Sequence, residues 1–427
     1  MQGWLGGFKR FEKRGGRLAL LTAVFAAVSI LPAYATETET ESVCITCHTE
    51  LEGELQAPAV EWPNSAHAKA GVMCQDCHGG DPGDMELAMK TKGYQPRPKR
   101  DEIAKMCAKC HADPLRMRQH NLRTDQFDLY SGSVHGKKMA EHDIESATCV
   151  DCHGKHEIRK IDDPLASVNR ANVVQTCGKC HSDRKIMEKR KIPLNQYELY
   201  KGSVHGQAYF ERHDLGVPTC VNCHGNHGIQ KPQQMTTRFV CAECHVEQAD
   251  AYKKSRHWAA AQETGKPLCI HCHGNHGIAR PSSEKFNTPG DTNCLSCHAK
   301  NSIQMEGAAA LFTATTTAKE ALSRAQASFK SMREWSGSGF ETSQLKANLA
   351  KAEKTYAGMR TAAHSLNVAA VKADGDAVKQ ISASITTEVD RMMRELRIRK
   401  IGLAVTWLVA ILFSAAIWQR ARYCKRD

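Results

Sequence analysis

The chain has 427 residues, enough for two or three ordinary domains, but its composition is not ordinary. Aromatic residues make up only 6%, and the 41% hydrophobic fraction includes 19 cysteines and two dense apolar runs at the chain ends. The middle is therefore poor in large core-forming side chains, which predicts that something else fills its interior. The net charge of +12 comes mainly from the two ends, and no nucleic-acid motif accompanies it, so nucleic-acid binding is not expected.

Residues 1–35 are predicted to be a secretory signal peptide. Five basic residues precede an apolar stretch at residues 18–31, and Ala33-Tyr34-Ala35 is a small-x-small cleavage site. An uncleaved N-terminal anchor is the alternative. In both cases the rest of the chain is exported.

Eighteen of the 19 cysteines fall into nine Cys-x-x-Cys-His motifs, and Cys424 is left over. The paired cysteines are Cys44, Cys47, Cys74, Cys77, Cys107, Cys110, Cys149, Cys152, Cys177, Cys180, Cys220, Cys223, Cys241, Cys244, Cys269, Cys272, Cys294 and Cys297. The histidines that end the motifs are His48, His78, His111, His153, His181, His224, His245, His273 and His298.

Each motif is the attachment signature of a c-type haem. Two thiols add across the haem vinyl groups, and the following histidine reaches the iron as its proximal ligand. Zinc binding and disulfide formation are the alternatives for paired cysteines, but neither explains a histidine after all nine pairs. The sequence therefore predicts nine covalently attached haem c groups within residues 44–298, and their porphyrins as the core of that segment.

The motifs repeat as pairs. One member follows a Ser-x-His element and continues as Cys-His-Gly-x-His, as in Ser133-Val-His135 with Cys149-Val-Asp-Cys-His-Gly-Lys-His156. The other member is plain. The first copy is degenerate, because Asp81 stands where the trailing histidine is expected, and the motif at Cys44 is a single opening motif.

Twelve histidines lie outside the motif ends, and we interpret most of them as distal axial ligands, which would give six-coordinate haems suited to electron transfer. The alternative is a surface histidine kept by copying of the repeat. His271 lies inside a motif, where it is not expected to fold back. Seven candidates recur in phase with the repeat, and four others could complete the set: His67, His135, His156, His205, His227, His257 and His276, then His142, His213, His120 and His364.

From about Ala308 the apolar residues recur at helical spacing in three stripes, with breaks expected at residues 336–339 and 374–376. This pattern predicts an antiparallel helical bundle or coiled coil whose third helix continues into the membrane. His364 borders the second stripe, where it is either a packed or solvated residue or a distal ligand.

Residues 401–418 carry no charge and are long enough to span most of a bilayer core. Basic residues bracket this run on both sides, which argues against the alternative of a buried helix in a soluble domain. They are Arg397, Arg399, Lys400, Arg420 and Arg422.

The predicted fold class is mostly α and irregular: a haem-cored multihaem cytochrome c domain, a helical bundle and one C-terminal transmembrane helix. The predicted boundaries are 1–35 for the signal peptide, 36–304 for the nonahaem domain, 305–400 for the periplasmic bundle, 401–418 for the transmembrane helix and 419–427 for a cytoplasmic tail.

The nine motifs with their Ser-x-His and Cys-His-Gly-x-His elements resemble those of bacterial multihaem c-type cytochromes, above all the class with doubled motifs and class III cytochrome c character. The C-terminal helices also resemble the arrangement in octahaem hydroxylamine-oxidoreductase-like and pentahaem nitrite-reductase enzymes. Those nitrite reductases use a lysine as proximal ligand at the catalytic haem, whereas every motif here ends in histidine.

The resemblance implies electron transfer in respiration. We expect an inner-membrane protein with its bulk in the periplasm and no catalytic residues of its own. It would pass electrons between a quinone-linked membrane partner and periplasmic cytochromes or a reductase. The alternative is a multihaem reductase or oxidase that acts on a small nitrogen or sulfur compound at one five-coordinate haem.

Overall fold

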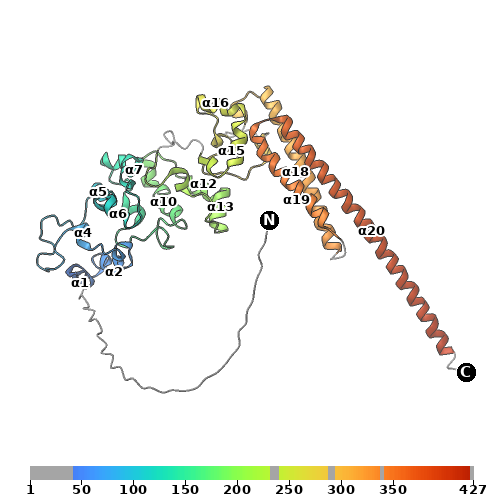
Figure 1. The fold of residues 1–427 in the computed structure, drawn as a ribbon, viewed down its shortest axis with the longest axis horizontal. Coiled ribbons are helices and arrows are strands. Elements are labelled where there is room, and N and C mark those ends of the chain that lie inside the picture. The colour runs from blue at the N-terminus through green and yellow to red at the C-terminus, as the bar shows by residue number, and fades with distance from the viewer. Residues whose placement is uncertain (1–41, 231–239, 287–293, 337–340, 424–427) are drawn as a thin grey trace, which may run out of the picture.

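The computed structural model describes residues 42–230, 240–286, 294–336 and 341–423, and these residues form helices and irregular segments without a β-strand. The helices fall into two groups (Figure 1). A long array of short helices carries the cysteine motifs, and three long helices follow it. The mostly α and irregular fold class predicted from the sequence is confirmed.

The first group holds seventeen α-helices of four to twelve residues and several short 3-10 helices. The α-helices are α1 (Val43–Thr49), α2 (Ala57–Glu61), α3 (Ala66–Lys69), α4 (Cys74–His78), α5 (Arg100–His111), α6 (Pro114–Arg118), α7 (Gln126–Gly132), α8 (Val134–Ala140), α9 (Cys149–His153), α10 (Val173–His181), α11 (Arg184–Lys189), α12 (Gln196–Gly202), α13 (Val204–Glu211), α14 (Cys220–His224), α15 (Val246–Lys253), α16 (Arg256–Thr264) and α17 (Cys269–His273). The 3-10 helices of the described residues are η1 (Gly53–Leu55), η2 (Trp62–Asn64), η4 (Val240–Glu243), η5 (Ser283–Phe286) and η6 (Cys294–Ser296).

The motif-bearing segment builds little apolar core from its own side chains. Its largest buried cluster centres on Val173, Val174 and Tyr209, which pack beside the motifs at Cys177 and Cys220. The two larger clusters both lie in the long helices. The segment therefore has the sparse side-chain interior that its composition predicts.

The long helices are α18 (Ile303–Ser336), α19 (Ser343–Ala362) and α20 (Val368–Tyr423), with η7 (Ala363–Ser365) between the last two. Helix α20 packs along both α18 and α19, and the buried residues are those of the predicted stripes. From α18, for example, Leu311, Leu322 and Phe329 are buried. The helical bundle is confirmed. Helix α18 ends at Ser336 and α19 begins at Ser343, whereas the predicted first break at residues 336–339 lies mostly outside the described residues.

The second predicted break, at residues 374–376, is wrong, because α20 runs through it without interruption. Gly375 is buried in the bundle, and a Cβ added there would lie 3.0 Å from Met359 Cε and 3.3 Å from the carbonyl oxygen of Ala314. This glycine lets three helices approach closely. The chain turns instead at Leu366, which has a positive φ of 56°.

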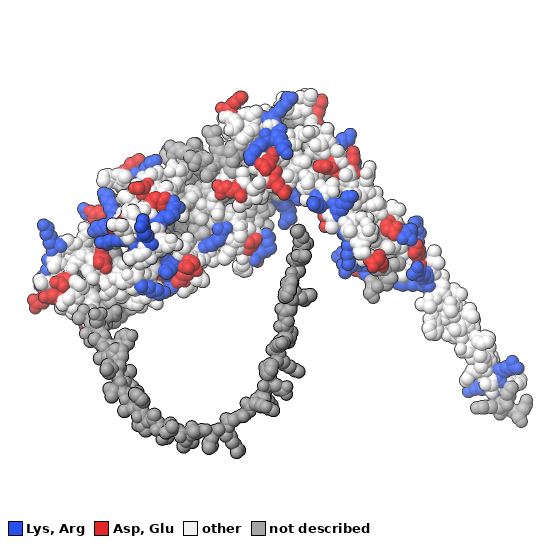
Figure 2. Space-filling view, viewed as in Figure 1, with Lys and Arg blue, Asp and Glu red and all other residues white. Residues whose placement is uncertain are grey.

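The last part of α20 is long and apolar enough to cross a membrane, and its most apolar window has a mean hydropathy of 2.2 and is wholly exposed. In Figure 2 this stretch is an uncharged band with basic side chains at both ends. The Lys400 ammonium lies 5.0 Å from the Trp335 ring, and the Arg422 guanidinium lies 4.1 Å from the Trp418 ring. An apolar helix with basic residues and tryptophans at each end is typical of a membrane anchor.

Candidate haem sites

Most cysteine motifs form one turn of helix, and this turn brings both thiols and the imidazole to one side. Residues three and four apart lie on the same face of a helix, so the first cysteine, second cysteine and histidine of each motif share a face. Where the motif continues as Cys-His-Gly, the glycine ends the helix directly after the histidine. Gly154, for example, has a φ of 85°, a conformation that glycine adopts without steric cost.

The upstream histidines are positioned by serine caps. Ser65, Ser133, Ser203 and Ser255 each precede a helix and accept a hydrogen bond from the backbone N–H three residues on. Serine is a favoured N-cap because its hydroxyl satisfies one of the free N–H groups of the first turn. The histidine two residues after each serine is thereby fixed in the first turn of its helix.

Eight motif histidines have a second imidazole facing them. The ring pairs are His67–His111 (6.1 Å between centroids), His78–His156 (6.2 Å), His135–His181 (6.3 Å), His153–His227 (6.0 Å), His205–His245 (6.3 Å), His224–His276 (5.7 Å), His257–His298 (5.9 Å) and His273–His364 (6.0 Å). All seven histidines in repeat phase belong to these pairs, and so does His364.

These separations fit one metal ion held between two imidazoles. Two metal–nitrogen bonds of about 2 Å, plus about 1.1 Å from each nitrogen to its ring centre, put the centroids about 6.2 Å apart. The residues present therefore fit an iron of haem with histidine on both sides. Each ring of a pair comes from a different helix or turn, as axial ligands on opposite faces of a macrocycle require.

Burial favours the neutral, metal-binding form of several of these imidazoles. Burial and the neighbouring His227 lower the pKa of His153 to about 4. The pKa values of His135 and His181 are lowered in the same way, first by burial.

The pairs follow two rules that link the repeats. The upstream histidine of a copy faces the plain motif of the same copy, as His135 faces His181. The trailing histidine of a copy faces the glycine-type motif of the copy before it, as His227 faces His153. Sequence reasoning missed this order, although the repeat phase contains the signal for it.

Backbone hydrogen bonds hold the two kinds of second histidine side by side. The N–H of Val134, next to His135, donates to the carbonyl of Ile229, two residues after His227, at 2.8 Å. The same bond recurs in neighbouring copies, from Ala66 to Ile158 at 2.7 Å and from Val204 to Ile278 at 2.9 Å. Successive copies are therefore interlocked by main-chain geometry as well as by their imidazoles.

His364 occupies the position that a fifth copy would supply. The last glycine-type motif, at Cys269, has no later copy to provide a trailing histidine. Its His273 faces His364, which η7 presents at the end of the bundle. The ring nitrogen Nδ1 of His364 lies 3.1 Å from the carbonyl oxygen of Arg360, which leaves Nε2 on the side away from the helix.

The sulfur atoms of successive motifs lie near one another in sequence order. The first cysteines of neighbouring motifs lie close enough to interact electrostatically in four pairs: Cys44–Cys74, Cys107–Cys149, Cys177–Cys220 and Cys241–Cys269. Between these pairs the second cysteines lie close enough to interact, as Cys77 does with Cys110 and Cys152 with Cys180. The nine motifs therefore form one unbranched series.

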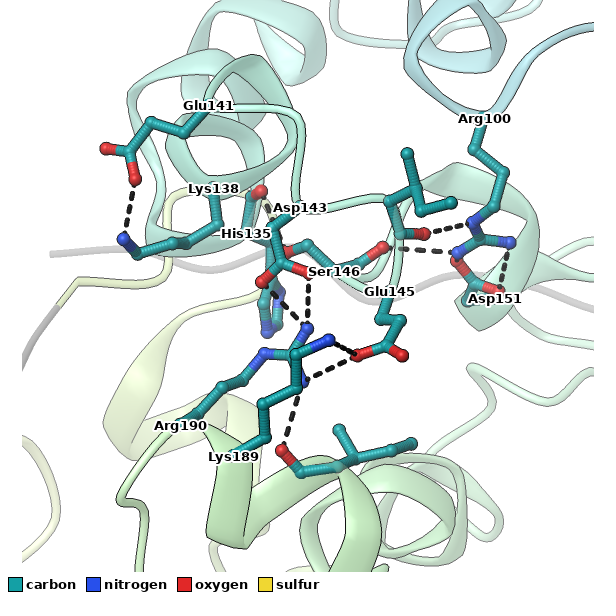
Figure 3. Close-up of polar contacts among 12 residues, drawn as sticks. Arg100, His135, Lys138, Glu141, Asp143, Glu145, Ser146, Asp151, Lys189 and Arg190 are labelled. Carbon is teal, nitrogen blue, oxygen red and sulfur yellow. Dashed lines mark hydrogen bonds and ion pairs between the residues drawn. The ribbon is translucent and has the colours of Figure 1, made fainter.

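Ion pairs fasten the elements that carry facing imidazoles (Figure 3). Arg190 follows the motif that ends in His181, and it binds both carboxylate oxygens of Asp143 at 2.5 and 2.7 Å. Asp143 lies in the loop after the helix of His135, and Ser146 in the same loop donates to the His135 carbonyl at 3.0 Å. This network ties together the two segments that hold the His135–His181 pair.

A second ion pair joins α5, the helix that ends in one motif, to the motif at Cys149 (Figure 3). Arg100 at the start of α5 binds Asp151 of the Cys149 motif at 2.6 Å and donates to the carbonyl of Ile144 at 2.6 Å. In the next copy Arg170 takes the same place and donates to the carbonyl of Val217 at 2.7 Å. The arginine therefore has a repeated positioning role.

The remaining candidates are not brought to a motif histidine as ring partners. His142 and His213 are exposed in equivalent loops with φ values of 64° and 52°, and His120 is exposed beside Gln119. His271 uses Nδ1 to accept the N–H of Leu268 at 2.9 Å and stays within its own turn, as the sequence predicts. Within the described residues, no group of three or more histidine, cysteine, aspartate or glutamate side chains is arranged to hold a bare metal ion.

Comparison with known protein families agrees with this geometry. A cytochrome c3 family model matches residues 66–182, and the model of cytochrome c554 and c-prime matches residues 26–79. No solved structure matches the chain. The likeness of the C-terminal helices to octahaem hydroxylamine-oxidoreductase-type proteins is not shown, because neither match reaches them. The motif series, the facing imidazoles and the two family matches support a multihaem c-type cytochrome with covalently bound haem.

Proposed function

We propose that the chain is a membrane-anchored, nonahaem electron-transfer cytochrome of the inner membrane with its bulk in the periplasm. It would connect a quinone-linked membrane partner with periplasmic cytochromes or a reductase. Haem iron supplies one-electron redox chemistry, and the role of the protein is to ligate, order and anchor the haems.

The observation that carries this proposal is the set of eight facing imidazole pairs. Histidine on both sides closes an iron to substrates and favours electron transfer over catalysis. The pairs recur from the second motif to the last, which supports a carrier in which nearly every haem has the same task.

The unbranched series of motifs supports transfer along one path. Successive motifs lie close enough to interact through their cysteine sulfur atoms, as Cys107 does with Cys149. The two ends of the series, near Cys44 and near Cys294, are then the natural points of entry and exit. The direction of transfer depends on the partners and on the haem potentials.

The length of the bundle is evidence for a membrane partner whose redox centre lies above the membrane surface. An α-helix advances about 1.5 Å per residue, so α20 covers about 50 Å between Val368 and Ile401. His364, just before α20, lies at the end of the bundle away from the anchor. A quinone inside the bilayer is therefore far from the haem of His273 along this helix, and a membrane partner with its own redox centre would close that distance.

The proposal is tested by intact-mass analysis and haem quantification of the purified protein. We expect a mass above that of the bare chain by nine haems, and reduction of all nine in a redox titration. A mass equal to the apoprotein, or zinc in place of haem, contradicts the proposal. A variant that ends at Lys400 should keep its haems and be released from the membrane without detergent.

The second candidate function is a reductase or oxidase of a small nitrogen or sulfur compound. One observation favours it: the first motif histidine, His48, has no imidazole partner among the described residues. Steady-state turnover of nitrite, hydroxylamine or sulfite with a chemical reductant would favour the enzyme. Reduction of the protein without turnover would favour the carrier.

A further inference from the structure

The structure pairs eight of the nine motif histidines with a second histidine. All 21 histidines lie in residues that the structure describes. Nine end the motifs, and eight others face them in the ring pairs. The four that remain, His120, His142, His213 and His271, are not ring partners of any motif histidine. The motif left without a second histidine is the first one, Cys44–Cys47–His48.

The repeat explains why this motif differs. The opening motif is a plain one, and a plain motif is faced by the Ser-x-His element of its own copy. Residues 1–43 contain no histidine, so no Ser-x-His element precedes the motif within them. The same rule explains why Asp81 stands where a trailing histidine is expected. A trailing histidine faces the glycine-type motif of the copy before it, and the described residues contain no glycine-type motif before the one at Cys74.

The first motif is otherwise built like the others. His48 Nδ1 lies 2.6 Å from the carbonyl oxygen of Leu55, just as His78 Nδ1 lies 2.8 Å from that of Gln95. This contact orients the ring and leaves Nε2 for an iron. Cys44 lies close to Cys74, whose pKa is raised by burial and by this neighbour, so the first motif is next to the second in the series.

We propose that the iron held by His48 has one axial position that no histidine fills, and that this position binds a small exogenous ligand. The ligand class is a molecule or anion with a carbon, nitrogen or oxygen donor, such as carbon monoxide, nitric oxide, azide or nitrite. The inference rests on the proposed function, since it requires a haem at the first motif. It makes the Cys44 end chemically distinct from the eight closed haems.

One segment could close this iron instead. The loop after Gly79 is fastened to the first motif by a 3.0 Å hydrogen bond from the Val43 N–H to the Pro82 carbonyl. Its Met85 and Met89 side chains are 55% and 63% exposed. A methionine thioether is a known axial haem ligand, and this loop is therefore the alternative that the experiment must distinguish.

The test uses the full-length holoprotein in detergent. Ferrous protein titrated with carbon monoxide should bind one equivalent per chain, and the ferric protein should show one high-spin haem by EPR and magnetic circular dichroism. The double variant Cys44→Ser/Cys47→Ser should lose one haem by mass together with both signals. The other eight haems should stay low-spin in that variant.

Nine low-spin haems and no carbon monoxide binding would overturn the inference. Carbon monoxide binding that persists in the double variant would overturn it as well. If nine low-spin haems are found, the double variant Met85→Leu/Met89→Leu identifies the ligand. A new high-spin haem in this variant would show that a methionine of the loop fills the axial position. A wild-type mass short of nine haems would instead count against the proposed function, so the two failures are distinguishable.

Discussion

Replacing His364 by alanine should open one haem and leave the bundle folded. The substitution removes the ring whose centroid lies 6.0 Å from that of His273. One of nine haems then loses its second imidazole, so about a ninth of the total haem signal should change from low-spin to high-spin.

The bundle should tolerate this change because His364 lies outside its core. Met359 and Ala363 remain buried, and the apolar cluster that packs α20 against α18 and α19 is made of other residues. The free energy of unfolding of the bundle should therefore change by less than about 0.5 kcal/mol, as for most substitutions outside a packed core.

The assay is EPR and magnetic circular dichroism of the ferric protein, with thermal unfolding followed by circular dichroism. His213→Ala is the matched control, since His213 was also a distal candidate but is exposed and not a ring partner. A His364→Ala protein with an unchanged spin-state spectrum would refute the ligand assignment. A new high-spin haem in His213→Ala would refute the order of the pairs.

Three further predictions concern packing around the sites. Gly206→Ala should displace His205 and convert one haem to the high-spin state, because the added Cβ would lie 1.9 Å from the carbonyl oxygen of Tyr200. The control Gly202→Ala adds a Cβ that meets nothing within 4 Å, so its haem spectrum should be unchanged. In a chemical denaturation experiment, Gly375→Leu should lower the free energy of unfolding of the bundle by about 1–3 kcal/mol, because the larger side chain overpacks the helix contact. Gly358 is at an exposed helix position, so Gly358→Ala should raise the free energy of unfolding by about 0.5–1 kcal/mol. Arg190→Ala should lower the free energy of unfolding by about 1–3 kcal/mol and loosen the His135–His181 pair, because it leaves the half-buried Asp143 without its partner. The control Arg184→Ala breaks an exposed ion pair and should lower the free energy of unfolding by less than about 1 kcal/mol. Equal losses in the two variants would contradict the positioning role of Arg190.

The sequence was sufficient to predict the motifs, the repeat and the bundle because each has a strong local signal. Cysteine and histidine at fixed spacing indicate haem attachment directly, and the apolar stripes of residues 311–396 indicate helices that pack on one another. The upstream and trailing histidines were found as candidates because they recur in phase.

Which imidazole faces which motif could not be read from local patterns. The two histidines of a pair are far apart in the sequence, up to 91 positions for His273 and His364, and many belong to different copies. Only the three-dimensional path of the chain brings them together. His364 has no repeat phase at all, and helical periodicity cannot show that a turn at the end of a bundle presents it outward. Gly375 was misinterpreted for a related reason, since a glycine that permits close helix packing looks the same in sequence as one that ends a helix.

The interlocked copies also constrain how such a chain can change its length. If one whole copy were duplicated or deleted in register, every interior histidine would still find its counterpart in the neighbouring unit. The array would then grow or shrink by two haems at a time, while His48 and His364 would stay at its two ends. Loss of a fraction of a copy would break this register and leave histidines of two neighbouring units without partners.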